Sequence, residues 1–338
     1  MRSKPSQYIG VAVASDRETA LRGCDGDPPQ VVVEAADDGT RRSEDMSGVA
    51  IGALAGIGFG LFQAVNRRVN VTLDVYRATF GLMAVGTVLL VVIALATQDV
   101  GQVLRAPAGA LAAFAAAGFL HFFVGWTCLG LSQQRIGAAR TGALLGAMPL
   151  FGALGAAIVL GEVLTWPALV AVAVVVAGVT AVALSGRTNA PTSSLTGVAF
   201  ALATGLCWSL SPLFIRIGLR GLASPLLGVT VGMVATTLVY GVVVAVLAQS
   251  SPAVAVRRVL GFVVLAGVFV GLSIWGYWAA LDLAPVGVVL AVTQLSAPTV
   301  AIASPLVSGD PLGGGGRWLW IGIGLILTGS VALLLRVG

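Results

Sequence analysis

The chain has 338 residues, of which 57% are hydrophobic and 10% charged, and its mean hydropathy is +0.98. Soluble domains carry about 25% charged residues, so the composition excludes an ordinary soluble protein and predicts a membrane protein. Nine acidic and six basic residues in 1–45 give a net charge of −3, whereas 13 arginines and five acidic residues in 46–338 give +8. Arginines in short connections between apolar segments are typical of anchors at lipid headgroups. They do not indicate nucleic-acid binding.

The start of the chain is a polar tail. Its one apolar stretch, Tyr8–Ala14, is short and precedes charged sequence with Gly and Pro, which does not fit a secretory signal peptide. Because the tail has too little apolar sequence to bury a core, we expect residues 1–46 to be disordered. We expect no cofactor and no metal, since Cys24, Cys128 and Cys207 lack CxxC and metal-ligand spacing.

Ten apolar segments follow the tail, separated by short connections that carry Arg, Asp, Pro or Gly. A helix needs about 20 apolar residues to cross a bilayer core of about 30 Å, and each segment is close to that length. Continuous apolar runs such as Leu169–Val176 exclude the alternation of a membrane β-barrel. The segments are residues 48–66, 73–97, 108–131, 137–160, 165–185, 196–217, 224–248, 258–281, 285–307 and 318–336.

The second five segments repeat the first five. Superposed pairs at a shift of 149 are Gly48 with Gly197, Gly56 with Gly205, Arg67 with Arg216, Trp126 with Trp275, and Pro149 with Pro298; at a shift of 151, Gly178 falls on Gly329. Five crossings reverse the direction of the chain, so the second copy enters the membrane inverted. We predict an all-α membrane protein with ten transmembrane helices as two inverted five-helix repeats, residues 47–186 and 195–337. Many secondary transporters are built in this way, with the substrate near the midplane between the repeats.

Local patterns resemble the EamA-type family of the drug/metabolite transporter superfamily, over residues 47–337. The residues that carry the resemblance are Pro149, Leu160-Gly161-Glu162 and Gly178, their second copy Pro298, Ser308-Gly309-Asp310 and Gly329, and Arg77 near the start of the second segment. The resemblance implies a ten-helix transporter of the cell membrane, with both termini cytoplasmic, which moves small metabolites, often outward. The near-membrane arginines, six on the expected inner side and seven on the outer, leave the orientation to the resemblance.

Small residues and prolines mark candidate packing and hinge positions. Gly48, Gly52, Gly56 and Gly60 form a stripe on one helix face, repeated as Gly197, Ala201, Gly205 and Ser209. Such stripes permit close helix packing in lipid, and the same smooth faces would also let the halves slide. Pro149 and Pro298 lie at equivalent places in the fourth and ninth segments. Paired helix interruptions of this kind indicate a central cavity.

His121 is the only histidine and lies near the centre of the third segment. With α-helical spacing it shares a face with Gly118, Gly125 and Cys128, so its ring should point into a helix interface or cavity. One interpretation is a neutral, hydrogen-bonded side chain. The other is a group that couples proton movement to substrate, because histidine can change its charge near neutral pH. The second copy has Val270 at this place, so any such role is asymmetric.

Charged residues near the segment ends have two interpretations. Arg140 is a candidate for binding a substrate anion, or it reaches the headgroups. Asp74 and Arg77 should pair along one helix face. Glu162 and Asp282 should stay solvated or cap a neighbouring helix.

Polar and aromatic side chains within the segments complete the predicted substrate site. Tryptophans near span ends are usually interfacial, whereas a buried glutamine must face protein or water. An apolar and aromatic lining would suit an amphipathic or aromatic solute better than a phosphorylated one. The predicted substrate-binding residues are Gln63, His121, Trp126, Arg140, Trp208, Ser211, Trp275, Tyr277 and Gln294.

These features predict a secondary transporter that exports a small organic metabolite, such as an amino acid or an amphipathic amine, by alternating access. Lipid scrambling and channel-like permeation stay open as alternatives. A membrane enzyme is less favoured, because the sequence has no HExxH, no GxSxG and no paired midplane aspartates, and ATP-driven pumping is excluded by the lack of a Walker motif. The expected partners are the solute, the lipid bilayer and protons as a coupling ion, with a homodimer left open.

Overall fold

A computed structural model describes the protein from residue 30 onward. The described residues are 30–70, 72–136, 141, 144–145, 148–163, 165–185, 195–247, 253–308 and 317–337. Within these ranges every regular element is a helix, and no strand occurs. Residues 1–39 and 40–338 are separate compact units, and the packing reported below is that of 40–338.

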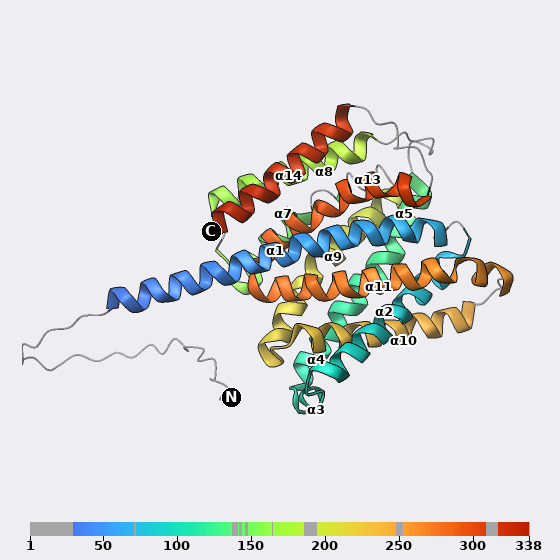
Figure 1. The fold of residues 1–338 in the computed structure, drawn as a ribbon, viewed down its shortest axis with the longest axis horizontal. Helices are drawn as coiled ribbons and strands as arrows, with labels where there is room; N and C mark the ends of the chain where they lie inside the picture. The colour runs from blue at the N-terminus through green and yellow to red at the C-terminus, as the bar shows by residue number, and fades with distance from the viewer. Residues whose placement is uncertain are drawn as a thin grey trace, which may run out of the picture. The chain divides into compact units, whose positions relative to one another are not determined.

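The helices follow the apolar segments of the sequence in order (Figure 1). In the first half they are α1 (Gln30–Asn70), α2 (Val75–Thr97), α3 (Gly101–Arg105), α4 (Ala108–Gly118), the π-helix η1 (Phe119–Gly125), α5 (Trp126–Ile136), α7 (Met148–Leu160) and α8 (Trp166–Ser185). In the second half they are α9 (Leu195–Gly221), α10 (Pro225–Leu247), α11 (Ala253–Leu283), α12 (Val286–Val292), the 3₁₀-helix η2 (Thr293–Leu295), α13 (Ser296–Ser308) and α14 (Arg317–Val337).

The expected boundary at residue 46 falls inside a helix, because α1 begins at Gln30. Residues 1–29 of the predicted tail lie outside the described residues. The membrane-length segment of α1 begins at Ser43, so the last residues of the predicted tail belong to the same helix as the first apolar segment.

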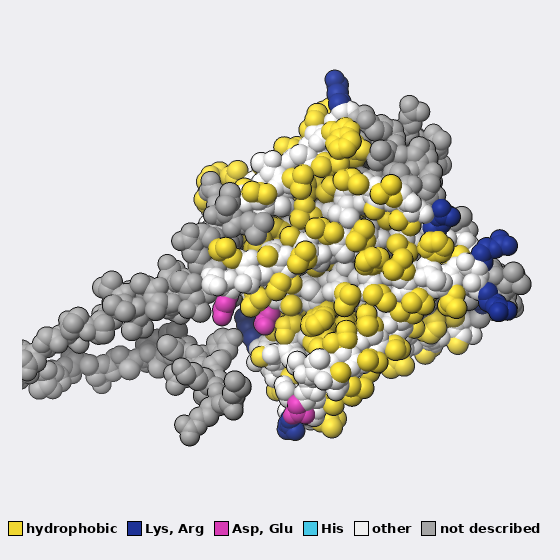
Figure 2. All heavy atoms as spheres, in the orientation of Figure 1, with side chains coloured by type: hydrophobic (Ala, Val, Ile, Leu, Met, Phe, Trp, Pro, Cys, Tyr) yellow, Lys and Arg dark blue, Asp and Glu magenta, His cyan; other side chains and the backbone are white. Residues whose placement is uncertain are grey.

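Among the described residues, six helical segments are long and apolar enough to cross a membrane. They are Ser43–Asn66, Tyr76–Thr97, Ala108–Ser132, Leu195–Gly221, Pro225–Val246 and Arg257–Leu283, which are the predicted spans one to three and six to eight. Shorter apolar helices occur at the other four predicted spans, as Phe151–Leu160, Trp166–Ala181, Val286–Val300 and Arg317–Ala332. Hydrophobic side chains cover much of the face drawn in Figure 2, and the charged ones lie toward its edges. The chain is therefore a helical membrane protein.

The helices α8 and α14 lie side by side and contact each other reciprocally (Figure 1). A Cβ placed on Gly178 of α8 would lie 2.8 Å from the Gly322 carbonyl oxygen and from Ile326 of α14. Gly329 of α14 makes the equivalent contacts with α8. A Cβ placed on it would lie 2.9 Å from the Ala171 carbonyl oxygen and 2.6 Å from Val175. The late part of each helix thus meets the early part of the other, which makes the pair antiparallel.

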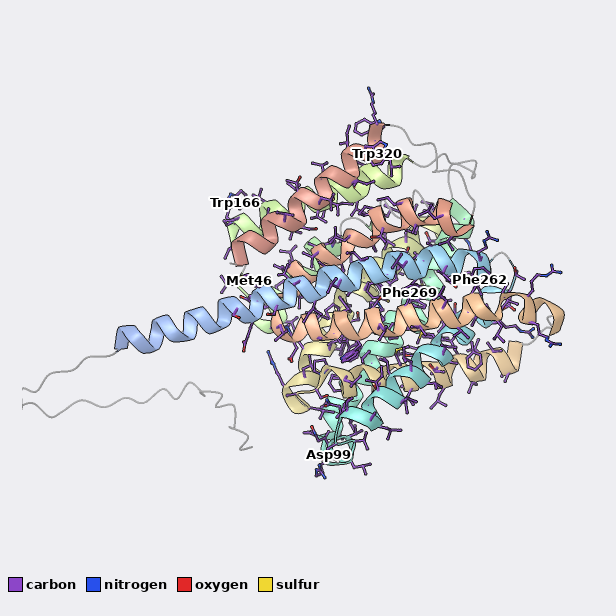
Figure 3. All side chains as sticks on the ribbon, in the orientation of Figure 1. Met46, Asp99, Trp166, Phe262, Phe269 and Trp320 are labelled. Atoms are coloured by element: carbon purple, nitrogen blue, oxygen red, sulfur yellow. The ribbon has the colours of Figure 1, made fainter. Side chains whose placement is uncertain are left out.

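Tryptophans mark the two ends of this pair. Trp166 at the start of α8 and Trp320 near the start of α14 lie at opposite ends in Figure 3, and their side chains are 75% and 58% exposed. Exposed tryptophans at the ends of an apolar helix are typical of the membrane interface. The other labelled side chains in the figure include Asp99, beside α3.

The glycine stripe of the first span packs against the ninth span. A Cβ on Gly52 would lie 3.0 Å from Val292, and one on Gly56 would lie 2.7 Å from the Thr293 oxygen. The repeat of the stripe on α9 faces the fourth span, where Ser209 donates a hydrogen bond to the Met148 carbonyl at 3.2 Å. Each copy thus lays its first helix against the fourth helix of the other copy.

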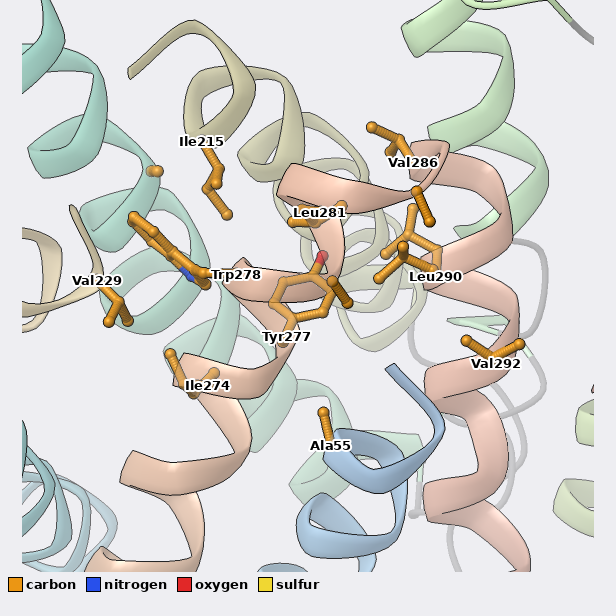
Figure 4. Close-up of a cluster of buried hydrophobic side chains, with 14 of the residues drawn as sticks. Ala55, Ile215, Val229, Ile274, Tyr277, Trp278, Leu281, Val286, Leu290 and Val292 are labelled. Atoms are coloured by element: carbon orange, nitrogen blue, oxygen red, sulfur yellow. The ribbon is translucent and has the colours of Figure 1, made fainter. Parts of the chain in front are cut away.

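A cluster of fully buried side chains joins α11 and α12 to the rest of this fold (Figure 4). It includes Tyr277, Trp278 and Leu281 of α11 and Leu290 of α12, each at most 2% exposed. Burial of apolar area stabilises a fold by about 25 cal/mol per Å² when that area is withdrawn from water. Lipid is itself apolar, so within a membrane this cluster stabilises the fold through close packing. It fixes one wall of the region around His121.

Candidate functional site

The third span is not a uniform α-helix. Between α4 and α5 the seven residues Phe119–Gly125 wind as a π-helix, with His121 as the third of them. A π-helical turn inside an α-helix is rare and often occurs at functional sites, because it leaves backbone groups available for other partners. The irregular segment therefore indicates where the site lies.

His121 contacts two side chains of α9. Its Nδ1 atom lies 2.9 Å from the Ser211 hydroxyl oxygen, and its ring stacks on the Trp208 indole at a centroid distance of 5.5 Å and an angle of 20°. The indole N–H of Trp208 also donates a hydrogen bond to the His121 carbonyl oxygen at 2.9 Å. The histidine is thus held through its ring and its backbone at once.

Two side chains of α9 and α10 complete the contacts with this π-helix. Thr204 donates a hydrogen bond to the Gly125 carbonyl at 3.3 Å, and Tyr240 donates one to the Phe122 carbonyl at 3.2 Å. Carbonyl oxygens have two lone pairs, so these bonds add to those of the helix. They stabilise the wide turn in apolar surroundings, where unpaired backbone groups are costly.

Aromatic rings surround the histidine on its other sides. The Tyr277 ring of α11 lies 5.9 Å from the His121 ring and meets Phe59 of α1 edge-on at 6.3 Å. Trp126 stacks on Phe62 at 5.5 Å. The Tyr277 hydroxyl is buried and has no hydrogen-bond partner among the described residues.

Two more spans contain an irregular segment. Pro212 lies inside α9, directly after Ser211, and a proline there leaves the carbonyl four residues earlier, that of Trp208, without its helical partner. In the ninth span the 3₁₀-helix Thr293–Leu295 separates α12 from α13, and Pro298 is the third residue of α13. Broken helices of this kind line substrate sites in transporters.

Of the face predicted for His121, Gly118 and Gly125, the structure keeps His121 and Gly125 together against Trp208 of α9, but Gly118 lies on another face. A Cβ on Gly118 would lie 2.4 Å from the Gly232 oxygen of α10, whereas one on Gly125 would lie 2.4 Å from the Trp208 indole nitrogen of α9. The π-helical turn has more residues per turn than an α-helix. It therefore changes the angle between residues on its two sides, so that Gly118, which directly precedes the π-helix, does not share the face of His121 and Gly125.

The structure brings together four of the nine predicted substrate residues, His121, Trp208, Ser211 and Tyr277, with Trp126 near them on Phe122 at 5.6 Å. The remaining four are placed apart or are not described. Gln63 is exposed, Trp275 and Gln294 are half-buried, with Gln294 in η2, and Arg140 lies outside the described residues. Pro149 is buried as the second residue of α7.

Sequence reasoning missed Phe59, Phe62 and Phe122 because apolar aromatic residues are common in every span. It also missed Pro212, although a proline inside an apolar segment is a visible signal of an irregular helix. No pattern of composition distinguishes a π-helix in advance.

A second polar constellation lies at the end of α7. Glu162 accepts a hydrogen bond from Arg216 of α9 at 2.8 Å and one from the backbone N–H of Val286 at 2.9 Å. Arg216 also donates to the Ala284 carbonyl at 3.0 Å. Of the two predicted roles for Glu162, the structure shows the cap on a neighbouring helix, here α12. Asp74 and Arg77 pair as expected, at 3.5 Å.

The chemistry that these residues would offer a solute is that of ring faces and neutral hydrogen-bonding groups. Histidine, serine, tyrosine and indole groups offer donors and acceptors without a fixed charge. Among the described residues, no group of three or more His, Cys, Asp or Glu side chains could hold a metal ion.

Comparison with known proteins finds a family match for the first half of the chain. Residues 46–184 match the model of the EamA-like transporter family. This family is part of the drug/metabolite transporter superfamily, and residues 46–184 are the part of the chain that is similar to it. The match begins where the first apolar segment begins and ends with the fifth, so the resemblance drawn from the sequence is confirmed for the first copy.

Solved structures are similar in fold to this chain over most of its length. One of them, titled only as the crystal structure of a protein, is similar with a TM-score of 0.70 and 19% identity, over 86% of this chain and 98% of its own. At that identity the likeness shows the fold alone. None of the curated proteins matches the sequence.

Proposed function

We propose that this EamA-like protein is a secondary transporter that exports a small organic metabolite, such as an amino acid or an amphipathic amine, by alternating access. The observation that carries the proposal is the contact between the π-helix and the proline-containing helix α9 at one aromatic site. The π-helix around His121 contacts α9 beside Pro212, and η2 interrupts the ninth span. The family match to transporters supports transport over catalysis.

The mechanism rests on two five-helix repeats of opposite orientation, 47–186 and 195–337. The reciprocal contacts of Gly178 and Gly329 support a twofold axis in the membrane plane, since a rotation of this kind exchanges the two helices. Two similar halves can then exchange conformations and open the site to each side in turn. We place both termini on the cytoplasmic side of the cell membrane, as the family resemblance implies.

The aromatic walls favour solutes with a flat or apolar part. Ring stacking is worth about 0.5–1.5 kcal/mol beyond buried area, and His121 and Tyr277 add hydrogen-bonding atoms. Protons as the coupling ion and the export direction belong to the same proposal.

The test is counterflow of radiolabelled tryptophan, tryptamine and lysine in proteoliposomes, with and without a pH gradient. His121→Asn keeps a hydrogen-bonding group toward Ser211 without an imidazole, and His121→Ala removes both. Val270→Ala, at the repeat-equivalent position, is the matched control. We expect saturable counterflow of an aromatic solute that falls at least about tenfold, or about 1.4 kcal/mol, in His121→Ala and persists in Val270→Ala.

The response of His121→Asn to the gradient decides the coupling. Gradient-driven uptake lost in His121→Asn while counterflow continues would support proton coupling through the imidazole. An unchanged counterflow rate in both His121 variants would support a carrier but contradict a role for the histidine in its substrate site. Movement of labelled lipid with no saturable solute flux would contradict the transporter and favour a scramblase.

A further inference from the structure

One carboxylate joins three helices at the end of the molecule where α7 finishes. Glu162 holds Arg216 at the end of α9 through Oε1 and the first N–H of α12 through Oε2. Arg216 in turn holds the carbonyl of Ala284, just before α12. We name these four groups, Glu162, Arg216, the Ala284 carbonyl and the Val286 N–H, the carboxylate clamp.

The clamp closes over tightly packed backbones. A Cβ on Gly287 of α12 would lie 2.4 Å from Ala153 of α7, and one on Gly152 of α7 would lie 2.0 Å from Leu290. Every residue of α12, Val286–Val292, is buried. The fourth and ninth spans therefore leave no room for a solute at this end.

Directly after α12 and Thr293, the ninth span is less buried than it is next to the clamp. After the fully buried α12 and Thr293, the residues Gln294–Ala297 are only partly buried. The ion pair itself is largely withdrawn from solvent, with side-chain exposures of 25% for Arg216 and 15% for Glu162. Removal of one partner from such a pair leaves an uncompensated charge withdrawn from solvent, which is strongly destabilising.

We infer that the carboxylate clamp is a gate, which holds this end of the transporter shut and must break for the site to open here. The inference rests on the proposed transport function, and it identifies the bonds that are made in one conformation and lost in the other. A single carboxylate that bonds three helices has this effect because α7 and α12 belong to different repeats. Their separation is the movement that alternating access needs at this end.

The test measures opening directly, without solute. Val286→Cys is introduced into a variant in which Cys24, Cys128 and Cys207 are alanine, and the thiol is labelled in proteoliposomes with a membrane-impermeant maleimide from the clamp side. The clamp variants are Glu162→Gln, which keeps an acceptor for the Val286 N–H, Glu162→Ala and Arg216→Gln. Counterflow of the cysteine-replaced parent reports separately on the proposed function.

Asp99→Asn is the matched control. Asp99 also pairs with an arginine, Arg105, and also accepts a backbone N–H, from Gly101 at 2.9 Å. Its pair lies within the connection between α2 and α4 and is 61% and 67% exposed. Asp99→Asn therefore breaks an ion pair between a carboxylate and an arginine, as the clamp variants do, but this pair does not join the two repeats.

We expect the labelling rate to rise at least about tenfold in Glu162→Ala and Arg216→Gln, because loss of the pair shifts the population toward the open state. Glu162→Gln should rise less, and Asp99→Asn should stay within about twofold of the parent. Unchanged labelling in folded, monodisperse Glu162→Ala and Arg216→Gln would overturn the gate. The clamp variants could label faster than a parent that itself moves no solute. This result would support the gate and contradict the proposed substrate class.

Discussion

Trp208 serves His121 in two separable ways. Its ring stacks on the imidazole, and its N–H bonds the carbonyl of the same residue. The first contact shapes the wall of the site, whereas the second fixes the backbone of the π-helix. The aromatic lining and the irregular helix therefore depend on one side chain.

Trp208→Phe separates these two roles, because phenylalanine keeps a ring and lacks the N–H. The lost hydrogen bond is worth about 1 kcal/mol, so we expect counterflow to fall about fivefold with little change in the protein yield. Trp318→Phe, at the exposed start of α14, is the control in the same assay. Equal rates for Trp208→Phe and the parent would show that the indole N–H does not support the site.

At the level of single residues, sequence reasoning named His121, Trp208 and Ser211, which meet in space, but not their phenylalanine neighbours. A lone histidine and a tryptophan–serine pair in apolar segments are conspicuous, and these residues do meet. Gln63 is conspicuous too, yet it is exposed, because polarity alone does not say which face of a helix a residue occupies. The bond between Glu162 and Arg216 joins residues 54 apart, which no local pattern relates.

Among the elements, α1 and η2 are fitted to each other through backbone contact. Gly56 faces the Thr293 carbonyl oxygen and Cα, at 2.7 and 2.9 Å from where a Cβ would stand. Gly60 lies as close to the Ser296 oxygen, at 2.8 Å. Backbone atoms cannot rotate aside as a side chain can, so the interface requires glycine at these places.

Gly56→Ala should therefore destabilise the protein. Overpacking of this kind costs about 1–3 kcal/mol, and we expect a lower Tm in detergent together with reduced counterflow. Gly324→Ala in α14 is the control, since nothing lies within 4 Å of its Cβ position. A Tm for Gly56→Ala equal to that of Gly324→Ala would contradict this packing.

The apolar segments and their order could be predicted, because membrane thickness fixes the length of a spanning helix. The internal breaks of the helices could be predicted only in part. Pro298 pointed to the ninth span, where η2 lies, but nothing in the residues of η1 predicted its π-helical winding. That winding depends on donors supplied by α9 and α10, which the local sequence does not contain.

For the whole molecule, the packing follows the same rule in both copies. The second span of one copy packs on the third span of the other, as α2 on α11 and α10 on α4, and a 2.8 Å hydrogen bond joins Thr87 of α2 to Thr237 of α10. Such exchange of partners is what a twofold axis between the copies would produce.

Opposite orientation of the two copies has a direct test. Ala108 and Arg257 are repeat-equivalent residues at the shift of 149, and both are exposed. In the cysteine-replaced protein we expect Ala108→Cys and Arg257→Cys to react with an impermeant thiol reagent from opposite sides of the membrane. Leu104→Cys, 91% exposed in α3, should react from the same side as Ala108→Cys. Labelling of all three from one side would contradict the inverted repeats.

The reciprocal seating of α8 and α14 also limits how far the two copies can drift apart in sequence. A side chain larger than glycine at position 178 would need space that Ile326 occupies, and one at position 329 would need the space of Val175. At this contact each helix therefore limits the size of the residue that the other can carry. A larger residue at position 178 or 329 would require a smaller one in the helix of the other half.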